Sequence, residues 1–174
     1  IFTSDHGFFL GEYGFAGKWT PHDVSIRVPL VIYDPRLAST ANSLRRSEIA
    51  LGIDMAPTIL GYAGVTPPRE MQGASLKPMI EGRQSSPWRT SFFYEHWFTA
   101  GGRIMPCEGV RDARWKYARY FVPGQVVAGA ARWGELFDLK TDPHETVNLA
   151  RDSAYADVLE QQRAAWRSWR QQVQ

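Results

Sequence analysis

The sequence has a single cysteine, Cys107, and no apolar run near the roughly 20 residues that a membrane-spanning helix needs. One thiol cannot form a disulfide within the chain, and no Cys/His spacing typical of a zinc site surrounds it. A marked excess of one charge is also missing, since 20 Lys and Arg stand against 18 Asp and Glu. This balance argues against a nucleic-acid-binding module and leaves other function classes open.

The most notable basic group lies near the end of the sequence, at Arg163, Arg167 and Arg170. Spacings of four and three residues place these side chains on one face of a helix. We interpret the group as the solvated face of that helix rather than as a phosphate-binding patch.

Hydrophobic residues make up 44% of the sequence, which is enough for a packed core. The sequence starts inside an apolar run, so we expect it to be the later part of a longer chain, truncated at its N-terminus. No targeting segment is seen, and under that expectation its absence says nothing about location.

Residues 1–84 show the pattern of an α/β domain with a parallel sheet. Residues 1–4 read as the end of a strand, and the apolar run 28–33 is typical of a strand buried on both faces of a parallel sheet. Apolar residues at helical spacing predict a helix over 47–63, with a second possible start at Asp54. Polar residues at the end of such a strand are candidate site residues.

Residues 85–174 show a different pattern, and the boundary falls in the Ser- and Pro-containing stretch at 84–87. Short strands joined by turns predict a small antiparallel sheet, and an apolar stripe with two tryptophans predicts a final helix that packs on it. The predicted strands are 91–98, 108–113, 115–121 and 135–139, and the helix is 155–171.

Three residues near the start carry side chains suited to hydrolytic chemistry. Asp5 and His6 follow the first strand, and an aspartate next to a histidine can hold a divalent cation. Lys18 is a cation that can neutralise charge on a leaving oxygen or on an anionic substrate. Taken alone, the Asp-His pair also fits ordinary turn chemistry, and Lys18 also fits a surface lysine.

Several short motifs together give the sequence a resemblance to the C-terminal half of sulfatases, which belong to the alkaline-phosphatase superfamily. The resemblance covers nearly the whole chain in order, and no single motif decides it. The motifs are Phe2-Thr3-Ser4-Asp5-His6-Gly7, Gly17-Lys18-Trp19-Thr20, Ser25-Ile26-Arg27-Val28-Pro29-Leu30, Ile53-Asp54-Met55-Ala56-Pro57-Thr58, Gly109-Val110-Arg111, Glu135-Leu136-Phe137-Asp138-Leu139 and Asp142-Pro143 with Glu145.

The resemblance implies an alkaline-phosphatase-like fold and specific roles. Asp5 and His6 would be ligands of a divalent cation, usually Ca²⁺, with Mn²⁺, Mg²⁺ or Zn²⁺ as alternatives. Lys18 would contact the sulfate and its bridging oxygen. The family nucleophile is a formylglycine made within a Cys/Ser-x-Pro/Ala-x-Arg motif, which this sequence does not contain. Cys107 does not fit that motif, so we interpret it as a buried or partly buried thiol and expect the chain alone to be inactive.

Two further histidines are weaker candidates for substrate binding. His22 follows the Lys18 segment, and His96 ends an aromatic strand that could lie near a sugar-binding pocket. For His96, packing among aromatic residues explains the position equally well.

The leading hypothesis is a sulfuric ester hydrolase that acts on sulfated carbohydrate. The alternatives are a hydrolase of phosphate or phosphonate esters from the same superfamily and a non-catalytic binding or scaffold domain. The family is compatible with a periplasmic or secreted location, while the location and the oligomeric state of this protein stay open.

Overall fold

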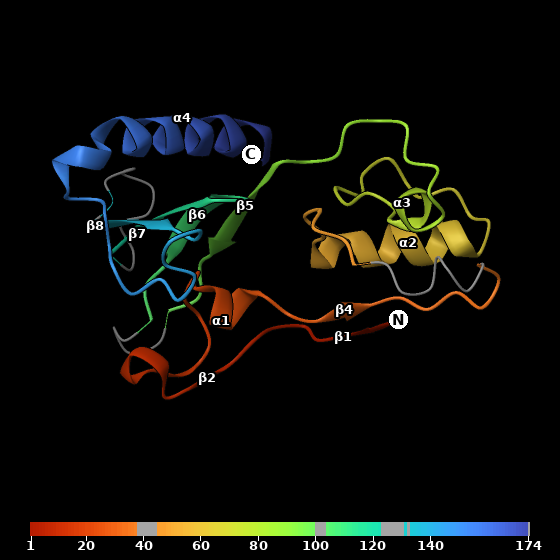
Figure 1. Cartoon of the computed structure of the whole chain (residues 1–174), viewed down its shortest axis with the longest axis horizontal. Coiled ribbons are helices and arrows are strands. Elements are labelled where there is room, and N and C mark those ends of the chain that lie inside the picture. The colour runs from red at the N-terminus through yellow and green to blue at the C-terminus, as the bar shows by residue number, and fades with distance from the viewer. Residues whose placement is uncertain (38–44, 100–103, 123–130, 132, 174) are drawn as a thin grey trace. The chain divides into compact units, whose positions relative to one another are not determined.

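The computed structural model describes residues 1–37, 45–99, 104–122, 131 and 133–173 (Figure 1). They form two compact units. Unit 1 consists of Ile1–Asp5 and Pro29–Thr90, and unit 2 of His6–Val28 and Ser91–Gln174. Residues 6–28 thus group with the later strands, whereas the predicted division puts them in the 1–84 domain. That division into domains stays a prediction.

In unit 1, strands β1 (Phe2–Thr3) and β4 (Leu30–Val31) pair antiparallel, with Phe2 opposite Val31. The prediction of a parallel strand buried on both faces is therefore wrong for this pair. The apolar run 28–33 indicates a strand, but it carries no information about the direction of its partner. Phe2 and Val31 are 67% and 58% exposed, because the described residues supply no further strand to cover this pair.

The helical part of unit 1 begins later than the longer prediction of 47–63. A 3₁₀ turn, η2 (Gly52–Asp54), leads into helix α2 (Met55–Tyr62), so the start at Asp54 is confirmed. A short helix, α3 (Lys77–Ile80), follows. The hydroxyl of Thr58 ties these helices together, because it donates to the Asp54 carbonyl at 2.6 Å and accepts from the Leu76 amide at 2.8 Å.

Asp54 has a larger role in unit 1 than that of a helix cap. Its carboxylate is fully buried and accepts hydrogen bonds from the amides of Leu51 (2.8 Å) and Ala74 (2.9 Å). The guanidinium of Arg89 pairs with both carboxylate oxygens, with Nη2 at 2.7 Å from Oδ1. One buried carboxylate thereby joins three segments of unit 1, at a site where it has a full set of partners.

Unit 2 contains the predicted antiparallel sheet, and all four predicted strands are confirmed. The order is β5-β6-β7-β8, and each neighbour is antiparallel. The strands are β5 (Ser91–His96), β6 (Cys107–Asp112), β7 (Trp115–Tyr120) and β8 (Trp133–Asp138).

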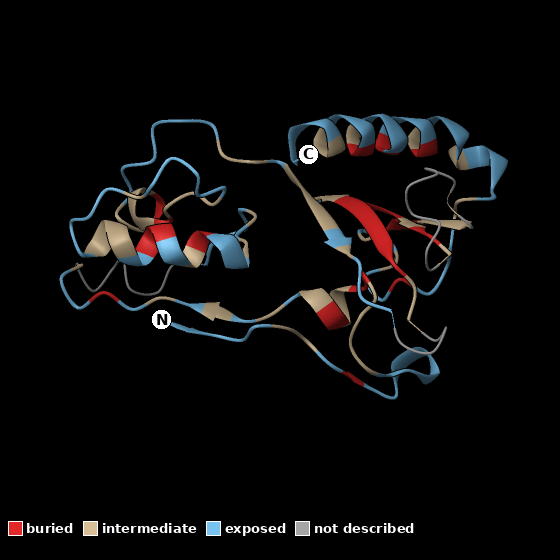
Figure 2. Cartoon of the chain, turned by 180° about the vertical axis from the view of Figure 1, so that it is seen from behind, coloured by how far each residue is buried: buried red, intermediate tan, exposed pale blue. Residues whose placement is uncertain are grey.

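The predicted final helix is present as α4 (Ala156–Val173), after a 3₁₀ turn, η4 (Ser153–Tyr155). Its buried residues Leu159 and Trp166 face the sheet, and its exposed side faces solvent (Figure 2). Leu159 and Trp166 pack on three residues of the sheet. These residues share one face because side chains alternate along a strand, and they are Val110, Tyr117 and Leu136. No helix in the described part of the chain is long and apolar enough to cross a membrane.

The first segment of unit 2, residues 6–28, contains a small hairpin and a one-turn helix. Strands β2 (Phe9–Leu10) and β3 (Ala16–Gly17) form a small hairpin around the 3₁₀ turn η1 (Glu12–Gly14). A one-turn helix, α1 (Asp23–Ile26), follows, with His22 as its N-cap residue. This segment carries Lys18 between the hairpin and α1.

Candidate active site

The Lys18 segment of unit 2, residues 17–20, has an unusual backbone. Trp19 has φ 97°, a left-handed value that is rare for a bulky side chain. Its amide donates to Ser25 Oγ at 3.2 Å, and its indole lies beneath the Lys18 ammonium, with Nζ 4.8 Å from the ring centre. Such conformations persist where surrounding contacts hold them and are concentrated at functional sites.

Trp19 also connects Lys18 to His96. The centres of the Trp19 and His96 rings are 5.1 Å apart, and the Phe98 ring lies 4.9 Å from that of Trp19. Both ring nitrogens of His96 are buried and have no hydrogen-bond partner among the described residues, and burial lowers the pKa of this histidine. The structure thus brings two of the predicted site residues, Lys18 and His96, to the same aromatic cluster.

His22 lies in a different environment. It is 7% exposed, and its Nδ1 is 2.9 Å from Thr20 Oγ1. Its ring packs against those of Phe9, Tyr13 and Phe137, and burial lowers its pKa. These contacts favour a packing role, and the suggested contact of His22 with substrate stays a prediction.

The Asp5–His6 pair lies where unit 1 passes into unit 2, so each residue is described within its own unit. His6 Nδ1 is 2.8 Å from the Gly7 carbonyl oxygen, which only accepts, so Nδ1 carries the proton. In the neutral ring the lone pair is then on Nε2. Histidines that bind metals commonly donate their other nitrogen to a carbonyl in this way. The tautomer of His6 therefore fits a metal ligand.

Gly7 completes the Asp-His-Gly motif for a steric reason. Its amide donates to the Ser25 carbonyl at 2.8 Å, which holds the segment against α1. A Cβ atom at this position would lie 2.0 Å from the Val24 carbonyl oxygen, so only glycine fits there.

The metal prediction itself stays open, because no group of three or more His, Cys, Asp or Glu side chains suited to an ion gathers within the described ranges. Asp5, which is exposed, and His6 would be two ligands of a larger set.

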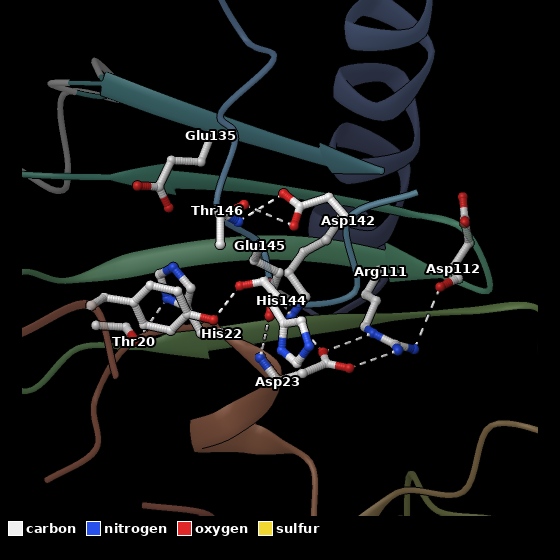
Figure 3. A network of polar contacts seen from close by, with 12 residues as sticks. Thr20, His22, Asp23, Arg111, Asp112, Glu135, Asp142, His144, Glu145 and Thr146 are labelled. Carbon is white, nitrogen blue, oxygen red and sulfur yellow. Dashed lines mark hydrogen bonds and ion pairs between the residues drawn. The ribbon is translucent and has the colours of Figure 1, made fainter. Parts of the chain in front are cut away.

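A buried ionic network, which sequence reasoning missed, supports the segment that carries Lys18 (Figure 3). Lys116 Nζ lies 2.5 Å from Asp23 Oδ1 and 2.6 Å from Glu145 Oε1. Arg111 donates to both carboxylate oxygens of Asp23, from Nε to Oδ1 at 3.2 Å and from Nη2 to Oδ2 at 3.0 Å. Asp23 is the first residue of α1, so the network fixes this turn to strands β6 and β7.

Glu145 closes the network from the other side. Its Oε2 accepts a hydrogen bond of 2.6 Å from the Asp23 amide, and its own backbone has φ 56°. Burial raises the pKa of Glu145, against the effect of Lys116. Burial also opposes ionisation of Asp23, but Lys116 and Arg111 outweigh it and lower the pKa of that carboxyl. Two of the motifs, Gly109-Val110-Arg111 and Asp142-Pro143 with Glu145, were the sequence signals that pointed here.

The single thiol is placed as expected. Cys107 is fully buried on β6, and burial raises its pKa to about 12. A thiol in this state is a poor nucleophile at neutral pH, which agrees with its interpretation as a structural residue.

A comparison with known families matches residues 11–172 to the model of the "N-sulphoglucosamine sulphohydrolase, C-terminal" family. The chain belongs to the sulfatase family. The predicted resemblance is thereby confirmed, and so is the mixed α/β fold class of the alkaline-phosphatase superfamily.

Two relatives illustrate the range of this sulfatase domain. An N-acetylglucosamine-6-O-sulfatase of Bacteroides thetaiotaomicron is 33% identical over 90% of the chain and 27% of its own length. A multifunctional alkaline phosphatase superfamily protein of Trinickia caryophylli is 35% identical over 98% of the chain and 34% of its own length. The chain therefore spans about a third or less of the relatives that it matches.

Solved structures give the same picture. One, described as a complex with its substrate D-glucosamine-2-N,6-O-disulfate, has a TM-score of 0.84 and 31% identity over 98% of this chain and 33% of its own. A phosphonate monoester hydrolase of Agrobacterium radiobacter has a TM-score of 0.81 and 29% identity over 99% of this chain and 34% of its own.

Proposed function

We propose that the protein containing this sulfatase domain hydrolyses sulfate esters of carbohydrates, and that the domain supplies Asp5, His6 and Lys18 to the reaction. The observation that carries the proposal is the Lys18 segment, in which a left-handed Trp19 supports the lysine and packs against His96. The choice of a sulfated sugar is supported by the relative that is an N-acetylglucosamine-6-O-sulfatase and by the similar structure with a sulfated glucosamine substrate.

The role proposed for Lys18 follows from its charge and its support. Its ammonium would bind the anionic ester group and stabilise negative charge that develops on the leaving oxygen. Trp19 limits the directions in which the flexible side chain can point, through a cation–π contact. His96, beside the same indole, would contact the sugar from the sheet.

Asp5 and His6 would bind a divalent cation, with Ca²⁺ as the leading candidate. A hard cation of this kind polarises the oxygens of a bound ester. The proton on His6 Nδ1 leaves Nε2 as the ligand atom, and Asp5 would add a carboxylate oxygen. The formylglycine nucleophile would come from sequence outside these 174 residues, so the domain by itself should not turn over.

Phosphonate monoester hydrolysis is the second candidate, and the comparisons give a specific reason to keep it. The phosphonate monoester hydrolase of Agrobacterium radiobacter is nearly as similar as the structure with a sulfated sugar. Sulfate and phosphonate esters are both tetrahedral anions, so Lys18 and a cation would suit either.

The test uses the protein expressed from its complete reading frame, with p-nitrophenyl sulfate, glucosamine 6-sulfate and p-nitrophenyl phenylphosphonate as substrates. Lys18→Ala should lower kcat/KM on the preferred ester by about 10²-fold or more, as loss of a charge-stabilising group does. Lys140→Ala, at an exposed position, is the matched control. EDTA should abolish turnover and Ca²⁺ restore it.

Each outcome has a clear reading. A higher kcat/KM on the phosphonate than on both sulfates would replace the first candidate by the second. No hydrolysis of any ester would favour a non-catalytic domain. Wild-type rates in both Lys18→Ala and Asp5→Ala would overturn the site assignment.

A further inference from the structure

A pocket of about 440 Å³ lies in unit 2 between α4 and strands β7 and β8. Tyr117, Arg119 and Gly134 contribute from the strands, and Glu160, Arg163 and Arg167 from the helix. Its volume is within the range of sites that hold small ligands. Three guanidinium groups against one carboxylate give the lining a net positive charge.

The space exists partly because Gly134 has no side chain. Gly134 lies directly opposite Arg119 in the register of β7 and β8. A Cβ atom there would sit 3.4 Å from the Tyr117 ring and 3.3 Å from the Ala118 carbonyl oxygen, so a larger residue would crowd the Tyr117 ring. Strand β8 is at the edge of the sheet, which leaves this side without a further strand among the described residues.

Each of the three arginines has a partner within unit 2. The Arg119 guanidinium lies over the Trp166 ring, with Cζ 3.9 Å from the ring centre. Arg163 and Arg167 both pair with Glu160, at 3.7 and 2.6 Å, and are about half exposed. One carboxylate cannot satisfy all the N–H donors of two guanidinium groups, since each carries five. The pocket therefore presents guanidinium N–H donors of the kind that bind the oxygens of a tetrahedral anion.

This pocket is separate from the Lys18 segment. Arg119 faces α4, and the next residue, Tyr120, faces the other side of the sheet together with Cys107. His96 is directly opposite Cys107 in the register, and its ring contacts Trp19. The pocket and the Lys18 segment therefore lie on opposite faces of the four-stranded sheet.

We propose that this pocket is a second binding site, which takes a sulfated sugar unit of an oligosaccharide away from the reacting ester. The three arginines would bind sulfate or carboxylate groups, and the Tyr117 ring would contact the sugar. The choice of a sulfated glycan rests on the proposed function, whereas the anion-binding character rests on the pocket alone. Two of the three arginines predicted to lie on a solvated helix face, Arg163 and Arg167, would then bind this ligand.

The test measures binding of a size-defined heparin hexasaccharide to the protein from its complete reading frame, at fixed salt, with and without chemical desulfation of the sugar. The double variant Arg163→Gln/Arg167→Gln should bind the sulfated hexasaccharide about tenfold or more weakly, because charge-assisted contacts are lost. Arg151→Gln, an exposed arginine outside the pocket, should bind like wild type. Hydrolysis of p-nitrophenyl sulfate should be unchanged in all three proteins.

Glu160→Gln provides a test of opposite sign. It removes the carboxylate that competes for Arg163 and Arg167, so it should tighten binding of the sulfated hexasaccharide. Unchanged binding in the double variant would overturn the proposal, and so would equal binding of the desulfated sugar. Equal or tighter binding of a single-stranded oligonucleotide, lost in the same variant, would replace the glycan by nucleic acid.

Failure of this inference and failure of the proposed function give different results. If the protein hydrolyses no sulfate ester but binds the sulfated hexasaccharide through Arg163 and Arg167, the proposed function is wrong and the pocket assignment stands. If the protein hydrolyses the esters but the double variant binds the hexasaccharide as well as wild type, the pocket assignment is wrong and the proposed function stands.

Discussion

The ammonium group of Lys116 lies 2.5 Å from a carboxylate oxygen of Asp23, although 93 positions separate them in the chain. Lys116 is 2% exposed, and Glu145 lies on its other side. This contact joins the middle of the sheet to the turn that follows Lys18. A buried charge with two partners is tolerated, whereas a buried charge that loses its partner is costly.

Lys116→Met should therefore destabilise unit 2 strongly. The change leaves the buried carboxylate of Glu145 without its cation and leaves Asp23 with Arg111 alone, and we expect a loss of about 3–5 kcal/mol in the free energy of unfolding. Urea denaturation measures it. Lys140→Met, the same change at an exposed site, should stay within about 0.5 kcal/mol of wild type. A loss no greater than the control's would show that the network contributes little.

Trp19 should act as a positioning residue for Lys18. Trp19→Ala removes a cation–π contact worth about 0.5–2 kcal/mol, so kcat/KM on the preferred ester should fall by about 2- to 30-fold. Trp19→Phe keeps an aromatic face and should recover most of the rate. The matching measurement is kcat and KM for both variants, together with their melting temperatures. Equal losses in the two variants, with unchanged melting, would contradict a role for the aromatic face.

Cys107 should be unreactive in the folded protein. Because burial raises its pKa to about 12, the thiol stays protonated at pH 8 and is also shielded from reagents. Iodoacetamide should label it slowly in buffer and completely in guanidinium chloride, as mass spectrometry would detect. Rapid labelling of the native protein would mean that β6 opens readily.

Glu108 should make folding less favourable as the pH rises. It is fully buried beneath α4, where it accepts a hydrogen bond from Trp166 Nε1 at 3.0 Å, and burial raises its pKa above the ordinary 4.5. Above that ordinary value the carboxyl ionises more readily in the unfolded chain, so its stabilising contribution is lost between the ordinary and the raised pKa.

Glu108→Gln keeps a hydrogen-bond acceptor and removes this titration. The free energy of unfolding of the variant, relative to wild type, should increase as the pH rises above the ordinary carboxyl pKa of 4.5. Urea titrations at several pH values measure the trend. Glu70→Gln, at an exposed position, serves as control. A difference that is flat with pH would mean that the buried carboxyl titrates normally.

The sequence by itself determined the strands β5 to β8, the helix α4 and the start of α2 after Asp54. Each of these depends on local periodicity or on a helix-start signal, which can be read within a short window. Its motifs also identified the family and the role of Lys18, and the aromatic strand that ends at His96 singled out that residue. The structure brings both side chains to Trp19. Asp5 and His6 as metal ligands stay predictions from the same motifs.

Tertiary structure alone decided the antiparallel pairing of β1 with β4, the network around Lys116 and the pocket beside α4. In the sequence, Asp23 and Lys116 look like any solvated charges, because nothing local marks a charge as buried. Likewise the sequence predicts that Arg163 and Arg167 lie on a solvated helix face. Only the fold shows that they line a pocket together with Gly134 of the edge strand. Contacts between distant segments depend on how the chain packs, and packing is a property of the whole fold.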